Sequence, residues 1–448
     1  MNFLIKISII VLLTASIMSG CGSGTGSGDN TGGMDRPDSN VSDGTENQQN
    51  NTQDEKDGNS GDIDNDDGRP DGSKTDDSPP GYEDDIAARI KEMTLDEKIG
   101  QMFIIGFDGT VISDELTQML KTRSPGGVIL FGRNVKSPDQ LLELINSIKR
   151  ANSGREPLFI SVDEEGGRVS RMPDVLSDIP SAAEIGEYGD TGVTYEIGML
   201  LADEISSFGF NMNFAPVLDI FSNPDNTVIS DRSFGNTAQA VSEHGVQLMK
   251  GIRDKNVIPV VKHFPGHGDT VADSHSELPV VNHDMERLAA IELVPFKKAI
   301  DENADAVMVG HLLMKSIDPE NPATMSEAII KGLLREQMGF DGVVLTDDMT
   351  MGAITKKYDI GDAAVSSVAA GSDMILVCHG FDDQIKAIDA VRSAVETGYI
   401  DEAGIDESVA RILRLKAKYG LDDRIIDSVD TEGLNKKIDG QLAKWYNE

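Results

Sequence analysis

The sequence predicts an α/β protein in which eight parallel strands close into a (β/α)8, TIM-type barrel. From about residue 85 onward, short and nearly continuous apolar runs alternate with longer stretches of helical periodicity. Apolar strands separated by helices are typical of a parallel sheet that is covered on both faces. Eight such units in about 330 residues fit a closed barrel better than an open doubly wound sheet. The open sheet remains the alternative, although no glycine fingerprint of the nucleotide-binding kind follows the first strand.

Residues 1–20 are predicted to form an export signal. Lys6 precedes a short apolar run, and small residues lead to Cys21. The run is too short for a comfortable membrane span and polar sequence follows it. The segment IMSGC (17–21) resembles a bacterial lipobox, which implies a lipid at Cys21 that anchors an extracytoplasmic protein to the cell membrane. The alternative is an ordinary cleaved signal with an incidental cysteine.

Residues 21–82 are predicted to form a disordered acidic tether. Between residues 22 and 82 there are 15 acidic and 4 basic residues and almost no large apolar side chains. Such a segment buries too little surface to offset its chain entropy. The whole chain is acidic too, with a formal net charge of −37. This charge argues against nucleic acid as a partner.

The barrel itself is expected to span residues 83–420, followed by a C-terminal extension at 421–448. The predicted strands are 102–107, 126–131, 158–163, 210–219, 257–264, 305–311, 342–348 and 373–378. The clearest amphipathic helices between them are 137–151, 194–208, 238–254, 284–302, 359–370 and 382–397.

Polar residues gather where the predicted strands end. In a barrel of this kind the chemistry lies at the carboxyl ends of the strands and in the loops that follow. We therefore expect one rim to bring together Asp163–Arg168 with Arg171, Asp231–Phe234, Lys262–His263, His311 and Thr346–Asp348.

The loop after the fifth strand, KHFPGHGDTVADSH (262–275), contains three of the seven histidines of the chain. A zinc site could use His263, His267, Asp273 and His275, but no HExxH or comparable spacing exists and Lys262 would place a cation beside the metal. A phosphate loop would need a Gly-Lys-Ser/Thr ending, which is absent. We expect neither a metal nor a cofactor.

A catalytic role for this loop rests on Asp273-Ser274-His275. The spacing lets the carboxylate hold one imidazole nitrogen while the other faces the site, which suits a general acid/base near neutral pH. His263 is expected to donate hydrogen bonds to a ligand or a neighbour, and His267 to shape the turn.

The same loop resembles the signature of the bacterial β-N-acetylglucosaminidases of glycoside hydrolase family 3, including those that recycle muropeptides. The segments DEEGGRVSR (163–171), DRSFG (231–235) and GVVLTDDMTM (342–351) match three further blocks of that family in the expected order. The resemblance covers about residues 85–420. About thirty residues follow the last barrel helix, too few for the second domain that supplies the acid/base in family β-glucosidases.

The resemblance implies a role for each matched residue. Asp347 would be the nucleophile, with Asp348 as its competitor, and His275 the acid/base that Asp273 orients. The sugar hydroxyls would be held by Asp163, Arg171, Arg232, Lys262 and His263. If His275 is not the proton donor, Glu164 and Glu165 are the next candidates.

The implied function is that of a retaining exo-hydrolase, which removes terminal β-linked N-acetylglucosamine (GlcNAc) from peptidoglycan fragments or chitooligosaccharides. Two alternatives stay open: a GlcNAc phosphorylase-type variant, and a surface lipoprotein that binds glycans without catalysis. The second cysteine, Cys378, lies in the apolar run DMILVC and is expected to be a small buried hydrophobe without a disulfide.

Overall fold

The computed structural model describes residues 82–445, except 271–272 and 275–276. The predicted signal, Cys21, the acidic tether and His275 therefore lie outside the described residues.

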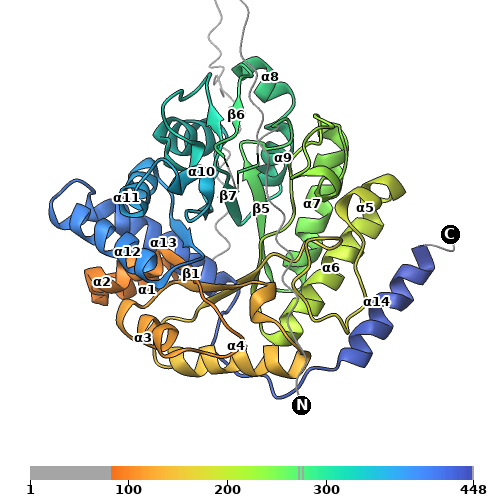
Figure 1. The fold of residues 1–448 in the computed structure, drawn as a ribbon, viewed down its shortest axis with the longest axis horizontal. Helices are drawn as coiled ribbons and strands as arrows, with labels where there is room; N and C mark the ends of the chain where they lie inside the picture. The colour runs from red at the N-terminus through yellow and green to blue at the C-terminus, as the bar shows by residue number, and fades with distance from the viewer. Residues whose placement is uncertain (1–81, 271–272, 275–276, 446–448) are drawn as a thin grey trace, which may run out of the picture. The chain divides into compact units, whose positions relative to one another are not determined.

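A closed parallel barrel forms the centre of the described chain (Figure 1). Its eight strands follow the order β1-β10-β9-β7-β5-β4-β3-β2, so the predicted fold class is confirmed. The strands are β1 (Phe103–Gly106), β2 (Gly127–Leu130), β3 (Phe159–Val162), β4 (Met212–Asn213), β5 (Ile258–Phe264), β7 (Ala306–Val309), β9 (Val343–Asp348) and β10 (Met374–Val377). Outside the barrel, β6 (Val280–Val281) pairs with β8 (Leu313–Met314).

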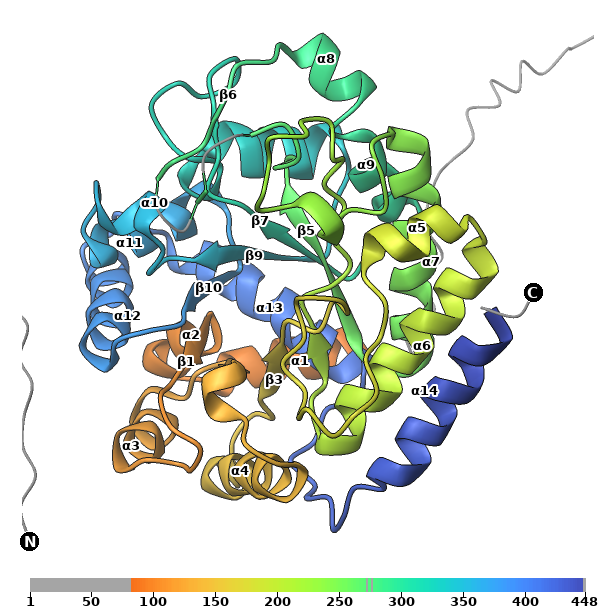
Figure 2. The same cartoon turned by 45° about the vertical axis from the view of Figure 1, so that its right-hand side comes forward.

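Helices surround this barrel (Figures 1 and 2). Many of them begin after a residue whose side chain caps the first turn. The side chains of Ser137, Asp190 and Thr237 accept hydrogen bonds from the first-turn N–H groups of α4, α6 and α7. The helices are α1 (Tyr82–Glu92), α2 (Leu95–Gln101), α3 (Asp114–Arg123), α4 (Pro138–Asn152), α5 (Ala182–Tyr188), α6 (Thr191–Phe208), α7 (Ala238–Asp254), α8 (Met285–Ala290), α9 (Val294–Asp301), α10 (Gly352–Thr355), α11 (Ile360–Ala370), α12 (Phe381–Glu396), α13 (Glu402–Lys418) and α14 (Thr431–Trp445). Single turns form η1 (Gly132–Asn134), η2 (Ser230–Arg232) and η3 (Ala323–Met325), and η4 (Ala328–Gln337) is a π-helix. No helix in the described part of the chain is both long and apolar enough to cross a membrane.

The fourth strand is much shorter than the predicted run 210–219. Regular pairing stops at Asn213, and Pro216 lacks the N–H that a central strand needs. The segment still follows β5, because the carbonyl oxygens of Ala215 and Pro216 accept from Val260 and Lys262 at 3.1 Å. This irregular course brings Asp219, the last residue of the predicted run, beside the end of β5.

Two helical regions also differ from the prediction. The single helix predicted at 284–302 is two helices, α8 and α9, because Pro295 can only occupy the first turn of a helix. The C-terminal extension, to which the sequence assigned no structure, contains α14. This helix packs along α6 and buries Ile438 and Trp445.

Candidate active site

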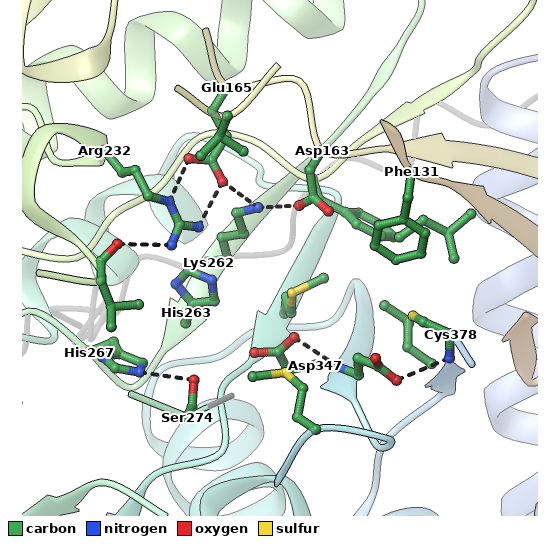
Figure 3. A pocket seen from close by; sticks show the side chains of 18 of the residues that line it. Phe131, Asp163, Glu165, Arg232, Lys262, His263, His267, Ser274, Asp347 and Cys378 are labelled. Carbon is green, nitrogen blue, oxygen red and sulfur yellow. Dashed lines mark hydrogen bonds and ion pairs between the residues drawn. The ribbon is translucent and has the colours of Figure 1, made fainter. Parts of the chain in front are cut away.

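A cavity of about 380 Å³ opens at the carboxyl ends of the barrel strands (Figure 3). Most of the residues assigned to a site from the sequence line it. Those that the structure brings together are Asp163, Arg171, Arg232, Lys262, His263, Asp273 and Asp347. The remaining one, His275, is not among the described residues.

Lys262 lines this cavity, and its ammonium group lies between two carboxylates. Its Nζ is 2.5 Å from Asp163 Oδ1 and 2.7 Å from Glu165 Oε1. The side chain of Lys262 is only 2% exposed, so both contacts are shielded from solvent. Lys262 therefore fixes Asp163, which follows β3, against β5.

Glu165 also binds Arg232 through both carboxylate oxygens, each 2.8 Å from a guanidinium nitrogen. Burial alone would raise the pKa of Glu165, but the charges of Arg232 and Lys262 and their hydrogen bonds hold it well below the usual range. A carboxylate that stays ionised in this way is unsuited to donating a proton. The geometry thus argues against Glu165 as the alternative acid.

The contacts of Glu164 indicate a structural role in the loop after β3. Its Oε2 accepts the backbone N–H of Arg171 at 2.7 Å and the hydroxyl of Ser170 at 3.0 Å, which fixes the loop that carries Arg171. Burial raises the pKa of Glu164 to about 7. However, the described residues that line the cavity do not include Glu164.

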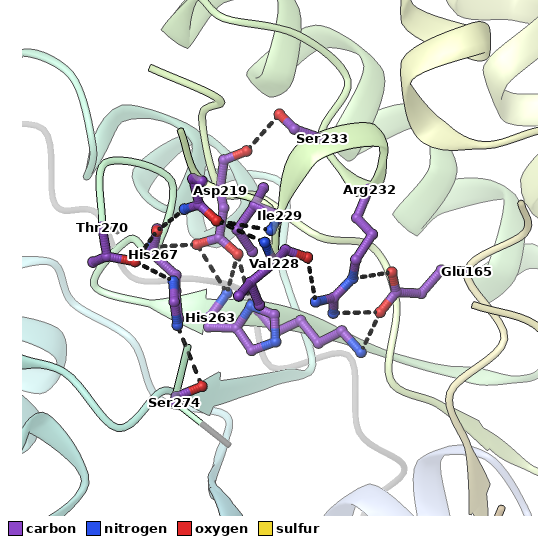
Figure 4. A network of polar contacts seen from close by, with 12 residues as sticks. Glu165, Asp219, Val228, Ile229, Arg232, Ser233, His263, His267, Thr270 and Ser274 are labelled. Atoms are coloured by element: carbon purple, nitrogen blue, oxygen red, sulfur yellow. Dashed lines mark hydrogen bonds and ion pairs between the residues drawn. The ribbon is translucent and has the colours of Figure 1, made fainter. Parts of the chain in front are cut away.

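The histidine loop is fastened to a residue that the sequence did not single out, Asp219 (Figure 4). This fully buried carboxylate contacts His263 Nδ1 at 2.6 Å and accepts the backbone N–H of His267 at 2.6 Å. The contact occupies Nδ1 of His263, so Nε2 is the ring atom that can meet a ligand. Asp219 ends the predicted strand 210–219, and extending the strand-end rule to it would have found it.

The two neighbouring aspartates on β9 differ in their surroundings. Both line the cavity, and Asp347 points into it and accepts the backbone N–H of Asp348 at 2.8 Å. Asp348 accepts from the backbone N–H and hydroxyl of Thr350 and from the backbone N–H of Cys378, at 2.7 to 3.0 Å. The carboxylate of Asp348 therefore holds the loop after β9 against the end of β10.

Electrostatics favour an ionised Asp347. Burial alone would raise its pKa, but nearby His311, His263 and Lys262 and the backbone N–H of Asp348 lower it below the usual value. An ionised carboxylate in a cavity lined by cations is suited to nucleophilic attack or to stabilising positive charge.

Two stacked aromatic rings, absent from the sequence assignments, form part of the wall of the cavity. The rings of Phe131 and His379 stack with centroids 5.6 Å apart, and the Arg133 guanidinium lies 4.3 Å from the Phe131 centroid. Cys378, beside this wall, is 1% exposed, which agrees with the small buried hydrophobe predicted there, and burial raises the pKa of its thiol. Among the described residues, no group of three or more His, Cys, Asp or Glu is arranged to hold a metal ion.

Comparison with known families identifies the group to which this site belongs. The family model of the glycosyl hydrolase family 3 N-terminal domain matches residues 94–415. The chain belongs to glycoside hydrolase family 3.

The names of similar proteins agree with one another. A β-hexosaminidase of Methylobacillus flagellatus is 37% identical over 60% of this chain and 79% of its own length. One from Nitrosomonas eutropha is 34% identical over 68% of this chain and 90% of its own length. A family 3 β-N-acetylglucosaminidase structure from a Paenibacillus species has a TM-score of 0.75 and 41% identity over 79% of this chain and 69% of that one. The chain is therefore a glycoside hydrolase of the β-N-acetylhexosaminidase type.

The contacts of Glu165 predict that Glu165→Gln lowers kcat/KM by a similar factor for all substrates. The substitution keeps the shape but removes the charge that balances Lys262 and Arg232. Loss of charge-assisted hydrogen bonds, about 1.5–3 kcal/mol, corresponds to a roughly 10- to 100-fold lower kcat/KM. Steady-state kinetics on an aryl glycoside and a disaccharide measure this, with Glu143→Gln on the exposed face of α4 as the control. Activity within about twofold of wild type would contradict the role given to Glu165.

Proposed function

We propose that this family 3 hydrolase is a retaining exo-β-N-acetylglucosaminidase. It releases terminal β-linked GlcNAc from the non-reducing end of peptidoglycan fragments or chitooligosaccharides. One observation carries the proposal: the same cavity is lined by an ionised Asp347 and by the polar side chains of Asp163, Lys262 and Arg232. The names of the similar proteins support GlcNAc as the sugar.

The two aspartates of β9 have separable duties in this proposal. Asp347 is the nucleophile, since the carboxylate of Asp348 is occupied by Thr350 and Cys378. The family signature, in which the nucleophile directly follows a Thr or Ser near the end of the strand, supports the same choice.

The reaction proceeds in two steps. A carboxylate oxygen of Asp347 bonds to the anomeric carbon while the glycosidic bond breaks, and His275 gives its proton to the departing oxygen. His275 then takes a proton from water, whose oxygen attacks the anomeric carbon and displaces Asp347. This is the scheme of retaining glycosidases, with an imidazole in place of the usual second carboxyl group.

Binding of the sugar falls to the polar side chains around the cavity. Asp163 and the Nε2 atom of His263 are suited to hydrogen bonds with hydroxyl groups, and Lys262, Arg171 and Arg232 supply cationic donors. Asp273, which also lines the cavity, orients His275 in this proposal.

Removing the nucleophile tests the proposal most simply. Asp347→Ala should abolish GlcNAc release from chitobiose and from a GlcNAc–anhydro-muramic disaccharide, while GlcNAc binding remains measurable by calorimetry. Assays with and without phosphate should both give free GlcNAc for the wild type. Asp348→Asn, whose amide oxygen can still accept from Thr350 and Cys378, is the matched control and should retain activity. If Asp348→Asn is inactive and Asp347→Ala is active, the nucleophile is Asp348.

The assignment of His275 predicts a dependence on the leaving group. His275→Ala should lose about a hundred- to ten-thousandfold on disaccharides, which need protonation of the departing oxygen. An activated dinitrophenyl glycoside needs little such help, so it should form the glycosyl-enzyme readily, and azide should then restore turnover. Rates for both substrates with and without azide measure this. Equal losses without azide rescue would mean that the proton donor lies elsewhere.

The lipobox leads to a proposal about location: a lipid at Cys21 holds the enzyme on the outside of the cell membrane. In a bacterial host, the full chain should partition into the detergent phase of Triton X-114, because acyl chains bury apolar surface there. Cys21→Ala should move it to the aqueous phase with unchanged activity. Equal partitioning of both chains would rule out the anchor.

A further inference from the structure

His267, within the histidine loop, is almost fully buried and linked on every polar side (Figure 4). Its backbone N–H donates to Asp219, and its carbonyl oxygen accepts from Asn226 at 2.8 Å. Its ring Nδ1 is 2.8 Å from Thr270 Oγ1, and its Nε2 is 3.4 Å from Ser274 Oγ. The ring thus connects the start of the loop to the Asp273–Ser274 segment.

Ser274 is held by two contacts, one to its own loop and one to α10. Its side chain is buried and contacts His267, while its carbonyl oxygen accepts the backbone N–H of Ala353 on α10 at 3.1 Å. Helix α10 follows the strand that carries Asp347. The position of Ser274 relative to Asp347 is therefore set from two sides.

The hydrogen-bond pattern assigns donors and acceptors along this path. The Thr270 hydroxyl donates to the His267 carbonyl oxygen at 3.0 Å, so its oxygen is left to accept from Nδ1–H. The Nε2 lone pair then accepts from the Ser274 hydroxyl. A neutral imidazole has this one donor and one acceptor, and burial lowers the pKa of His267, which favours the neutral form.

We propose that His267 is a positioning residue for proton transfer: it links the buried Asp219 to Ser274 and so holds Asp273 at the cavity. The inference rests on the proposed function, in which Asp273 orients the acid/base. Asp219 would then have two roles. Through His263 it fixes a ring proposed to bind the sugar, and through His267 it fixes the segment proposed to take part in proton transfer.

Two substitutions of His267 separate its two ring contacts. The amide of Asn reaches the position of Nδ1, so His267→Asn keeps the Thr270 contact and loses Ser274. The amide of Gln reaches the position of Nε2, so His267→Gln keeps an acceptor for the Ser274 hydroxyl. Ser274→Ala removes the same contact from the other side and leaves the Asp219 contacts intact.

Kinetics on chitobiose and on a dinitrophenyl GlcNAc glycoside test the proposal. His267→Asn and Ser274→Ala should lower kcat on chitobiose by about 10- to 100-fold, because small misplacements of a reacting group are this costly. Glycosylation by the dinitrophenyl glycoside and the KM values should stay within about threefold of wild type. His267→Gln should recover most of the loss, and the Asn/Ala double variant should be no worse than His267→Asn, since both remove one contact.

Equal losses on both substrates would overturn the proposal, as would a Gln variant as poor as the Asn variant. If His267→Asn lowers the thermal unfolding midpoint severely, Ser274→Ala alone decides the outcome by its substrate dependence. His275→Ala distinguishes the two levels of the account. If the loss depends on the leaving group in His275→Ala but not in Ser274→Ala, only the role proposed for His267 is wrong. If the loss does not depend on the leaving group in His275→Ala, the assignment of His275 as the acid/base is wrong.

Discussion

The buried ammonium of Lys262 constrains the whole site. A cation removed from solvent is strongly destabilising unless carboxylates compensate it, and here Asp163 and Glu165 do so within 2.7 Å. Because Glu165 also holds Arg232, the ends of β3 and β5 and the turn η2 are fixed to one another. The charges of His311, His263 and Lys262 together lower the pKa of Asp347, so the proposed binding residues and the proposed nucleophile share one electrostatic environment.

A second buried carboxylate, Asp219, organises the histidines as Glu165 organises the cations. Glu165 fixes groups suited to binding a sugar. Asp219 fixes His263, which we propose binds the sugar, and His267, whose ring leads to the segment that we propose takes part in proton transfer. Neither carboxylate needs to touch the reacting atoms. Pre-organisation of this kind lets the enzyme stabilise the transition state without rearranging its own dipoles during the reaction.

The sequence predicted those parts of the fold that follow from local periodicity. The predicted helix 238–254 coincides with α7, since its apolar stripe and Thr237 cap are local features. The strand-end rule brought Asp163, Lys262 and Asp347 together, because parallel strands share one carboxyl edge. Contacts between side chains on different strands could not be predicted from this rule, because no local pattern indicates them. Examples are the contacts of Glu165 with Arg232, of Asp219 with His263 and of Phe131 with His379. Two prolines did indicate departures from the predicted elements. Pro295 indicated a break in the helix predicted at 284–302, and Pro216 indicated an early end to the strand predicted at 210–219.

The central claim, that Asp347 forms a covalent bond with the sugar, is open to direct measurement. A slow fluorinated N-acetylglucosaminide should accumulate as a glycosyl-enzyme, because fluorine next to the reacting centre slows both steps and an activated leaving group spares the first. Mass spectrometry of the intact protein followed by peptide mapping would locate the adduct. We expect a single sugar on the peptide containing GVVLTDDMTM, attached to Asp347. A sugar attached to Asp348, or turnover of the probe without any adduct, would contradict this claim.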